Sequence, residues 1–297
     1  MQIQDYFING DVKAAIEYMK KNQEFKDILP AYIAIFEKCE YLTYDIPEFL
    51  NEILLTYQVY YRDIFYCGMK KEEADNKLIE QLKKLLNKPD ISEIELENKL
   101  VLIFEEYGYH ALFGSTQGYY GPYIWKETVP PKYNVELPNG SAMYTVNILR
   151  GFIFCSWMRY LTFGRFGTNG WASIDGTINC IEDGYDFKSE KFTISLLKHE
   201  AQHTVDMKQY PGIKEDELEY RAKLVELIYS NDISLLNKFI SVADENKVND
   251  GHAIASVRIK KELNDIDQSN IFEIKKYALT LFNQHNQEMS HKYLDLK

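Results

Sequence analysis

The chain of 297 residues is long enough for one large domain or two smaller ones, each with its own hydrophobic core. Hydrophobic residues make up 45% and aromatic residues 14%, which excludes a disordered protein. The formal net charge of -11 argues against nucleic acid or an anionic membrane as the main partner, because both attract basic surfaces. We therefore expect no nucleic-acid partner and no membrane partner.

The four cysteines are Cys39, Cys67, Cys155 and Cys180, which are far apart and form no CxxC pair. We expect buried free thiols rather than a disulfide scaffold or a set of metal ligands. The N-terminal residues show no basic stretch followed by an apolar run, and the longest apolar runs are far too short to span a membrane. These features predict a cytoplasmic protein.

The first 110 residues are predicted to form helices. Apolar residues recur at helical spacing through four segments, residues 11–21, 45–66, 70–88 and 92–110. Asp11 and Asp45 are the predicted N-caps of the first two helices, and Ser92 with Glu95 has the spacing of a capping box. The third helix is acidic at its start and basic at its end, as the helix dipole favours.

Between residues 111 and 187 glycine becomes frequent and β-forming runs replace the helical pattern. Asn139-Gly140 lies between two such runs, which predicts a hairpin, and the neighbouring Pro138 favours an edge position. Two more short strands are predicted around Asp175-Gly176. We expect these strands to form a small antiparallel sheet.

After Ser189 the helical pattern returns and continues to the end of the chain, with a turn at residues 209–214. The predicted class is α+β, mainly helical, with the small sheet ahead of the first of these helices. We divide the chain into an N-terminal helical region, 1–110, and a second region, 111–297. In the second region the sheet (111–187) precedes the helices (189–297).

The strongest chemical signal is the stretch KHEAQHTVD at residues 198–206, which contains an HExxH motif. His199 and His203 are four residues apart, so on a helix both imidazoles point from one face, one turn apart. That separation allows two nitrogens to bind one zinc ion at about 2.1 Å. Glu200 lies beside the metal without binding it and is suited to accept a proton from water. We predict one zinc ion per chain.

Ser189 is the expected N-cap of the helix that carries the motif, with Phe192, Leu196 and Leu197 on its buried face.

A catalytic zinc site needs a third protein ligand. If the chain reverses at Pro211-Gly212, the following helix runs antiparallel to the first, with Glu219 beside His203 and Glu226 beyond His199. Geometry alone does not separate these two glutamates. Asp206, one turn after His203, either orients an imidazole or is a solvated residue at the helix end.

The motif HEAQH with the downstream stretch LEYRAKL resembles the gluzincin metallopeptidases, the thermolysin-like class, over roughly Trp171 to Tyr229. The resemblance implies His199, His203 and Glu219 as metal ligands and Glu200 as the catalytic acid and base. It also implies an edge strand ahead of the metal helix, which we place at residues 176–183, along which a peptide substrate binds. Lys223 departs from the family pattern, because a small or acidic residue often stands four positions after the ligand glutamate. Asp206 or Glu226 would then have to replace that acidic group.

A donor for the developing oxyanion completes such a site. His252, at the start of a predicted helix, is the best candidate for this catalytic role, and members of the class often have a histidine or tyrosine downstream of the third ligand. Tyr220 and Arg221 are weaker candidates. His110, His285 and His291 lack metal-ligand spacing, so we expect them to be structural or exposed.

Taken together, the sequence predicts a zinc-dependent hydrolase of peptide bonds acting on a peptide or protein substrate. The alternative is a catalytically silent zincin-fold module that recognises a protein partner. A purely structural zinc is the weakest interpretation, because such sites are usually closed by four ligands and rich in cysteine. The sequence specifies neither the cleavage preference nor the oligomeric state.

Overall fold

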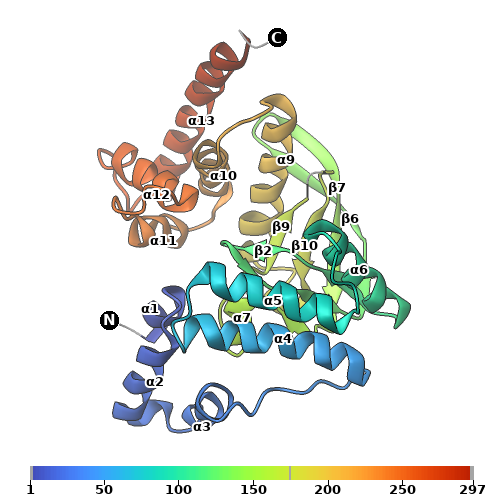
Figure 1. Cartoon of the computed structure of the whole chain (residues 1–297). Coiled ribbons are helices and arrows are strands. Elements are labelled where there is room, and N and C mark those ends of the chain that lie inside the picture. Colours follow the sequence, from blue (N-terminus) through green and yellow to red (C-terminus); the bar gives the residue numbers. More distant parts are fainter. Residues whose placement is uncertain (1–2, 174, 295–297) are drawn as a thin grey trace. The chain divides into compact units, whose positions relative to one another are not determined.

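Two units make up the protein in the computed structural model, which describes residues 3–173 and 175–294. The first unit comprises Met1–Thr128 and Arg150–Thr168, and the second comprises Val129–Leu149 and Asn169–Lys297. Helices dominate both units and the sheets are small, so the predicted α+β class is confirmed (Figure 1). No helix in the described residues is long and apolar enough to cross a membrane. The division at residue 110 stays a prediction.

The first unit is built mainly from helices. They are α1 (Ile3–Ile8), α2 (Val12–Lys21), η1 (Gln23–Phe25), α3 (Leu29–Tyr32), η2 (Ile33–Glu37), α4 (Glu48–Phe65), α5 (Lys71–Leu85), α6 (Glu93–Glu106) and α7 (Trp157–Leu161). Its short strands are β1 (His110–Leu112), β2 (Ser115–Thr116), β3 (Tyr119–Tyr120), β4 (Tyr123–Trp125) and β8 (Phe154–Cys155). They form a sheet of order β1-β4-β8 and a separate β2-β3 pair.

Two of the predicted helix caps are confirmed. The side chain of Asp11 accepts a hydrogen bond from the amide of Ala14, at the start of α2. Ser92 and Glu95 form the complete capping box of α6. The cap predicted at Asp45 is wrong, because α4 begins later, at Glu48, where Pro47 occupies the cap position without a side-chain hydrogen bond.

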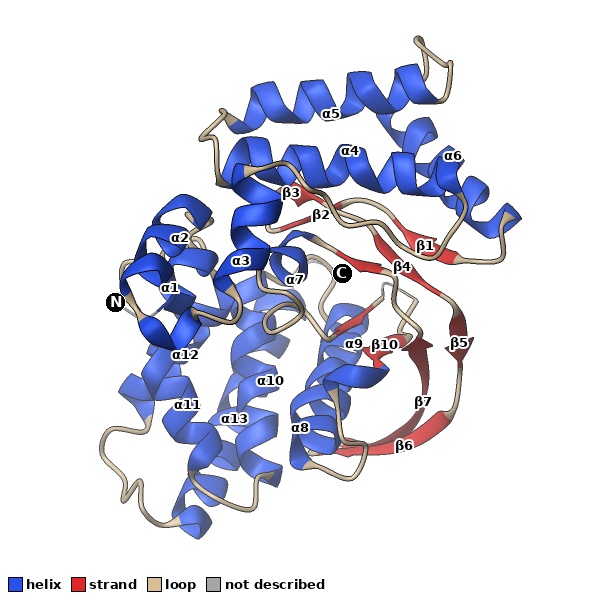
Figure 2. Cartoon of the chain, turned by 90° about the horizontal axis from the view of Figure 1, so that it is seen from below, coloured by secondary structure: helices blue, strands red, loops and turns tan. Residues whose placement is uncertain are grey.

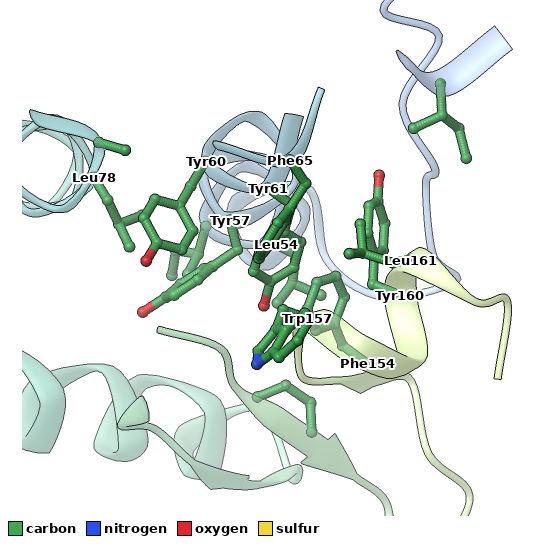
Figure 3. Packing of buried hydrophobic residues seen from close by; sticks show 14 of the residues in the cluster. Leu54, Tyr57, Tyr60, Tyr61, Phe65, Leu78, Phe154, Trp157, Tyr160 and Leu161 are labelled. Atoms are coloured by element: carbon green, nitrogen blue, oxygen red, sulfur yellow. The ribbon is translucent and has the colours of Figure 1, made fainter. Parts of the chain in front are cut away.

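Aromatic side chains fill the core of the first unit (Figure 3). On α4, Tyr57, Tyr61 and Phe65 point from one face of the helix, as their helical spacing dictates. Phe65 stacks on Trp157 of α7, with ring centroids 5.0 Å apart. The core thus explains much of the high tyrosine content and leaves few charged groups inside this unit.

The second unit contains a mixed sheet of order β7-β10-β9, with β6 paired to β7. Its strands are β6 (Lys132–Leu137), β7 (Gly140–Arg150), β9 (Gly170–Ala172) and β10 (Ile178–Ile181), while β5 (Glu127–Val129) lies where the chain passes between units. The β6-β7 hairpin is confirmed, although its two-residue turn is Pro138-Asn139, since Leu137 pairs with Gly140. The antiparallel β9-β10 pair is also confirmed. β10 runs parallel to β7, which makes the sheet mixed rather than wholly antiparallel.

Helices follow the sheet, as the periodicity indicated. They are α8 (Glu190–Phe192), η4 (Thr193–Lys198), α9 (His199–Gln209), α10 (Glu215–Tyr229), α11 (Ser234–Val242), α12 (Gly251–Glu262) and α13 (Ile271–Leu294), after the short turn η3 (Glu182–Gly184). In Figure 2 the curved β6-β7 hairpin lies alongside α8 and α9. One contact between them is the hydroxyl of Tyr144, which donates to the carbonyl of Ala201 over 3.3 Å.

None of the four cysteines is in a disulfide, as expected, but the expectation that they are buried is wrong for most of them. Cys180 alone among them is buried, and its burial raises the pKa of its thiol to about 12. Cys39 and Cys67 are exposed and Cys155 is half-buried. Wide spacing in the sequence does not report the side-chain environment, which the fold decides.

Candidate metal centre

The HExxH motif lies on α9, at the end of a longer helical segment that starts at Ser189. The side chain of Ser189 accepts a hydrogen bond from the amide of Phe192, so the predicted N-cap is confirmed. Phe192, Leu196 and Leu197 are buried, as the apolar pattern indicated. Thr193–Lys198 is π-helical, which the residue pattern does not predict. A π turn adds a residue to the helical repeat, so it sets where the face of His199 points.

α10 packs antiparallel beside α9, because the chain reverses between them. Gly212 in this turn has φ of 79°, a conformation that favours glycine. All residues from Glu219 to Leu227 of α10 are buried, so charged groups of this helix lie inside the second unit. They therefore need partners or a bound ion.

One residue of α10 and two of α9 form a group that could hold a metal ion: Glu219 with His199 and His203, whose ligand atoms all lie within 4.8 Å of one another. His203 Nε2 lies 3.1 Å from Glu219 Oε1, and His199 Nε2 lies 3.6 Å from Glu219 Oε2. Two donors bound to one zinc ion at about 2.1 Å in tetrahedral geometry are separated by about 3.4 Å. The spacing of these atoms therefore fits a single zinc-sized ion.

Glu226, the other glutamate that the sequence left open, contacts the opposite side of an imidazole. Its Oε1 lies 2.7 Å from His199 Nδ1. Burial alone would lower the pKa of His199, but Glu226 and Glu219 outweigh burial and raise it to about 10. A carboxylate on Nδ1 fixes the ring with Nε2 turned towards Glu219, which is the arrangement found behind many histidine metal ligands.

Glu219 is 5% exposed, so its carboxylate is almost entirely removed from water. Burial would raise its pKa, but the imidazoles of His199 and His203 outweigh burial and hold the pKa well below its usual range. The Oε2 atom has no partner with hydrogen-bond geometry among the described residues, although His252 Nδ1 lies 2.6 Å away. An ionised buried oxygen in this condition is consistent with a ligand for a cation. The donor set and its spacing therefore fit a bound zinc ion.

Glu200 points towards the edge of the sheet. Its Oε2 accepts a hydrogen bond from the amide of Ala172, in β9, over 2.9 Å. In this antiparallel pair Trp171 and Ser173 bond inwards to β10, so the polar groups of Gly170 and Ala172 face the free edge. The proposed base thus lies at the edge strand. Residue types cannot reveal this bond, because its donor is a backbone amide.

The substrate strand predicted at residues 176–183 is wrong in its position. β10 occupies Ile178–Ile181, but it is an inner strand paired to β7 on one side and β9 on the other. Its four residues are buried, as in an ordinary core strand. β9 is the edge strand beside α9, where Gly170 leaves no room for a Cβ against Leu196.

Asp206 takes neither of the two roles considered for it. It is fully buried, and its Oδ2 accepts a hydrogen bond from Arg221 Nε over 2.8 Å. The side-chain amide of Gln202 donates through Nε2 to Oδ1 of Asp206. Asp206 therefore joins α9 to α10 one turn away from the candidate ligands and does not contact an imidazole.

The remaining candidates fall into two groups. His252 reaches the site through its contact with Glu219, whereas the Tyr220 hydroxyl donates to Glu262 and Arg221 faces Asp206. Lys223, which breaks the family pattern, lies with its Nζ 3.8 Å from Glu219 Oε2. The other histidines are His110, which stacks on Trp125, His285, which is buried beside Glu217, and His291, which is exposed.

No family model matches the chain, and no curated protein and no solved structure matches it significantly. The resemblance to gluzincins is therefore carried by the buried group of His199, His203 and Glu219.

Proposed function

We propose that the protein is a zinc-dependent hydrolase of peptide bonds, with zinc held by His199, His203 and Glu219. The observation that carries the proposal is the arrangement of three donors at zinc spacing, two buried and one half-buried, beside a glutamate that does not belong to the donor set. A structural site would be expected to use a fourth protein ligand. The described residues that form this metal group supply three.

A bound zinc ion would supply the Lewis acidity that polarises a scissile carbonyl and acidifies a water molecule. Glu200 is the general base in this proposal. Its carboxylate accepts the proton of the attacking water and delivers it to the amine that leaves when the C–N bond breaks. The amide of Ala172 holds this carboxylate at the edge of the sheet, which limits the orientations it has to search.

The free edge of β9 is the surface we propose for the peptide. An extended substrate would add as a further strand, pairing with the outward-facing groups of Gly170 and the carbonyl of Ala172, while the Ala172 amide stays on Glu200. The same strand holds Glu200, so a peptide bound there would pass close to the base. This assigns to β9 the role first expected of β10.

His252 is the proposed oxyanion donor. Asp250 caps α12 by accepting from the amide of Ala253, which fixes the start of the helix that carries His252. The side chain of His252 is 61% exposed, so it is accessible to a substrate while Nδ1 contacts Glu219. A donor at this place would stabilise the negative charge that develops on the carbonyl oxygen.

Metal analysis combined with a proteolysis assay tests the proposal. We expect near-stoichiometric zinc in the wild type and in Glu200→Gln, because Glu200 is not a ligand. Cleavage of an unfolded protein substrate should fall about a hundredfold or more in Glu200→Gln, the contribution expected of a general base. Glu190→Gln, on the same helical segment but beside Asn231, is the matched control and should keep its activity.

A wild type that binds no zinc after reconstitution would overturn the metal site. Stoichiometric zinc without cleavage of any unfolded protein would contradict the hydrolase and favour the alternative, a zincin-fold module that binds a protein partner. Both measurements use the full chain.

A further inference from the structure

Lys223 is a lysine whose ammonium lies inside the protein. It is 6% exposed and projects from α10 one turn after Glu219. No hydrogen bond to its Nζ is found among the described residues, although Glu219 Oε2 lies 3.8 Å away. Burying a charged lysine is costly unless another charge compensates it. Groups next to Lys223 should therefore compensate its buried charge.

The neighbours of this ammonium are the carboxylate of Glu219 and the ring of Phe239. The Nζ lies 4.7 Å from the centre of the Phe239 ring, within the range of a cation–π contact. Glu226 follows Lys223 by three residues, on the same face of the helix, and its Oε1 lies 2.7 Å from His199 Nδ1. Lys223 thus lies between two buried carboxylates, one a candidate ligand and the other the partner of a ligand.

A metal ion and this ammonium would both neutralise Glu219. Lys223 Nζ lies 3.8 Å from Glu219 Oε2, a possible ligand atom. A metal ion bound to that oxygen would therefore lie within a few ångströms of the ammonium. Like charges at such a distance in a buried site repel strongly, because little water screens them. Lys223 therefore stabilises the metal-free site and opposes its loading.

We propose that Lys223 is the site's internal counter-ion, a positioning residue that keeps the metal-free centre folded and weakens metal binding. The proposal deepens the proposed function and rests on its metal site. It explains why a lysine stands where the gluzincin pattern often has an acidic or small residue. Glu226 then supplies the carboxylate behind His199 from one turn further along α10. The consequence is a centre that takes up and releases its metal reversibly.

Zinc affinity measured by competition with a chromogenic chelator tests this role on the full chain. We expect Lys223→Met to bind Zn²⁺ at least about tenfold more tightly than the wild type, because the repulsion is removed. Lys223→Arg keeps the charge and should stay near the wild-type affinity. The matched control is Lys198→Met, since Lys198 lies next to His199 but its ammonium faces the carbonyl of Glu136 and the ring of Tyr229. This control should also keep the wild-type affinity.

Thermal unfolding with and without zinc provides a second readout. A ligand that binds only the folded state raises the melting temperature by more when it binds more tightly. Without zinc, we expect Lys223→Met to have a lower melting temperature than the wild type. Adding zinc should raise the melting temperature of Lys223→Met by more than it raises that of the wild type.

Equal or weaker zinc binding by Lys223→Met would overturn the counter-ion role. So would failure of this variant to fold when it is produced with zinc, because the metal's charge should replace the ammonium. These results differ from failure of the proposed function, in which the wild type itself would bind no zinc.

Discussion

The interiors of the two units differ in kind. The first unit is filled with aromatic and aliphatic side chains, and its buried polar residues in the described part are Gln58, Asp63, Ser156 and Thr162. The second unit buries charged or ionisable groups in one place, on α9, α10 and α13: His199, Asp206, Glu219, Arg221, Lys223, Glu226 and His285. Buried charge is expensive unless it is compensated, and its concentration coincides with the possible metal site of His199, His203 and Glu219.

A second contrast lies within the second unit itself. Asp206 and Arg221 form a complete buried pair, whose guanidinium also donates to Asn286 over 2.7 Å. Glu219 Oε2 and His203 Nδ1 lack hydrogen-bond partners in the described part of the chain. A satisfied network stabilises a fold, whereas an unsatisfied carboxylate oxygen within a group of possible ligands is consistent with a bound cation.

The largest effect on folding should come from breaking the satisfied pair. Asp206→Ala leaves the guanidinium of Arg221 buried without its carboxylate, so we expect a loss of about 3–5 kcal/mol in the free energy of unfolding. Urea denaturation measures it. The control Glu245→Ala removes an exposed ion pair with Lys261 and should change nothing measurable. A loss as small as that of the control would mean that Asp206 does not brace the two helices.

A smaller effect, on metal affinity, separates the two glutamates that the sequence left open. Glu226→Gln removes the charge behind His199, and we expect zinc affinity to fall about 10- to 100-fold. Glu219→Gln removes a ligand and should reduce affinity further. Glu262→Gln, which alters the partner of Tyr220 on α12, is the control and should bind zinc normally. If Glu226→Gln has the larger effect of the two, the ligand assignment is wrong.

The smallest effect is expected in the first unit. The hydroxyl of Tyr61 is buried without a hydrogen-bond partner among the described residues, so Tyr61→Phe should leave stability unchanged or raise it slightly. Tyr160→Phe is the comparison, because its hydroxyl donates to Gln58 over 2.9 Å. That variant should lose about 1 kcal/mol in the free energy of unfolding. A comparable loss in Tyr61→Phe would mean that Tyr61 has a partner, such as a water molecule.

Much of the local structure could be predicted because its causes are local. Apolar periodicity located the helices, Asp11 and Ser92 located their caps, and the break at 209–214 separated α9 from α10. The cap predicted at Asp45 failed because Pro47 disfavours helical backbone at Ile46, the residue before it, so the helix starts after the proline.

The candidate centre could be predicted only in part. The spacing of His199 and His203 places both on one helical face in any α-helix, so that half followed from the sequence. The edge position of β9 could not be predicted, because strand order depends on pairing between segments distant in the chain. The π turn of η4 could not be predicted either, since its cause is packing rather than residue pattern.

The sequence by itself determined an α+β protein with an HExxH helix and a second, acidic helix turning back beside it. Only the tertiary structure decided how the acidic residues divide their roles. It places Glu219 facing both imidazoles, Glu226 behind His199 and Asp206 against Arg221. The physical reason is that spacing fixes the face from which a side chain leaves its helix, whereas the contact it makes depends on the separation and rotation of the packed helices.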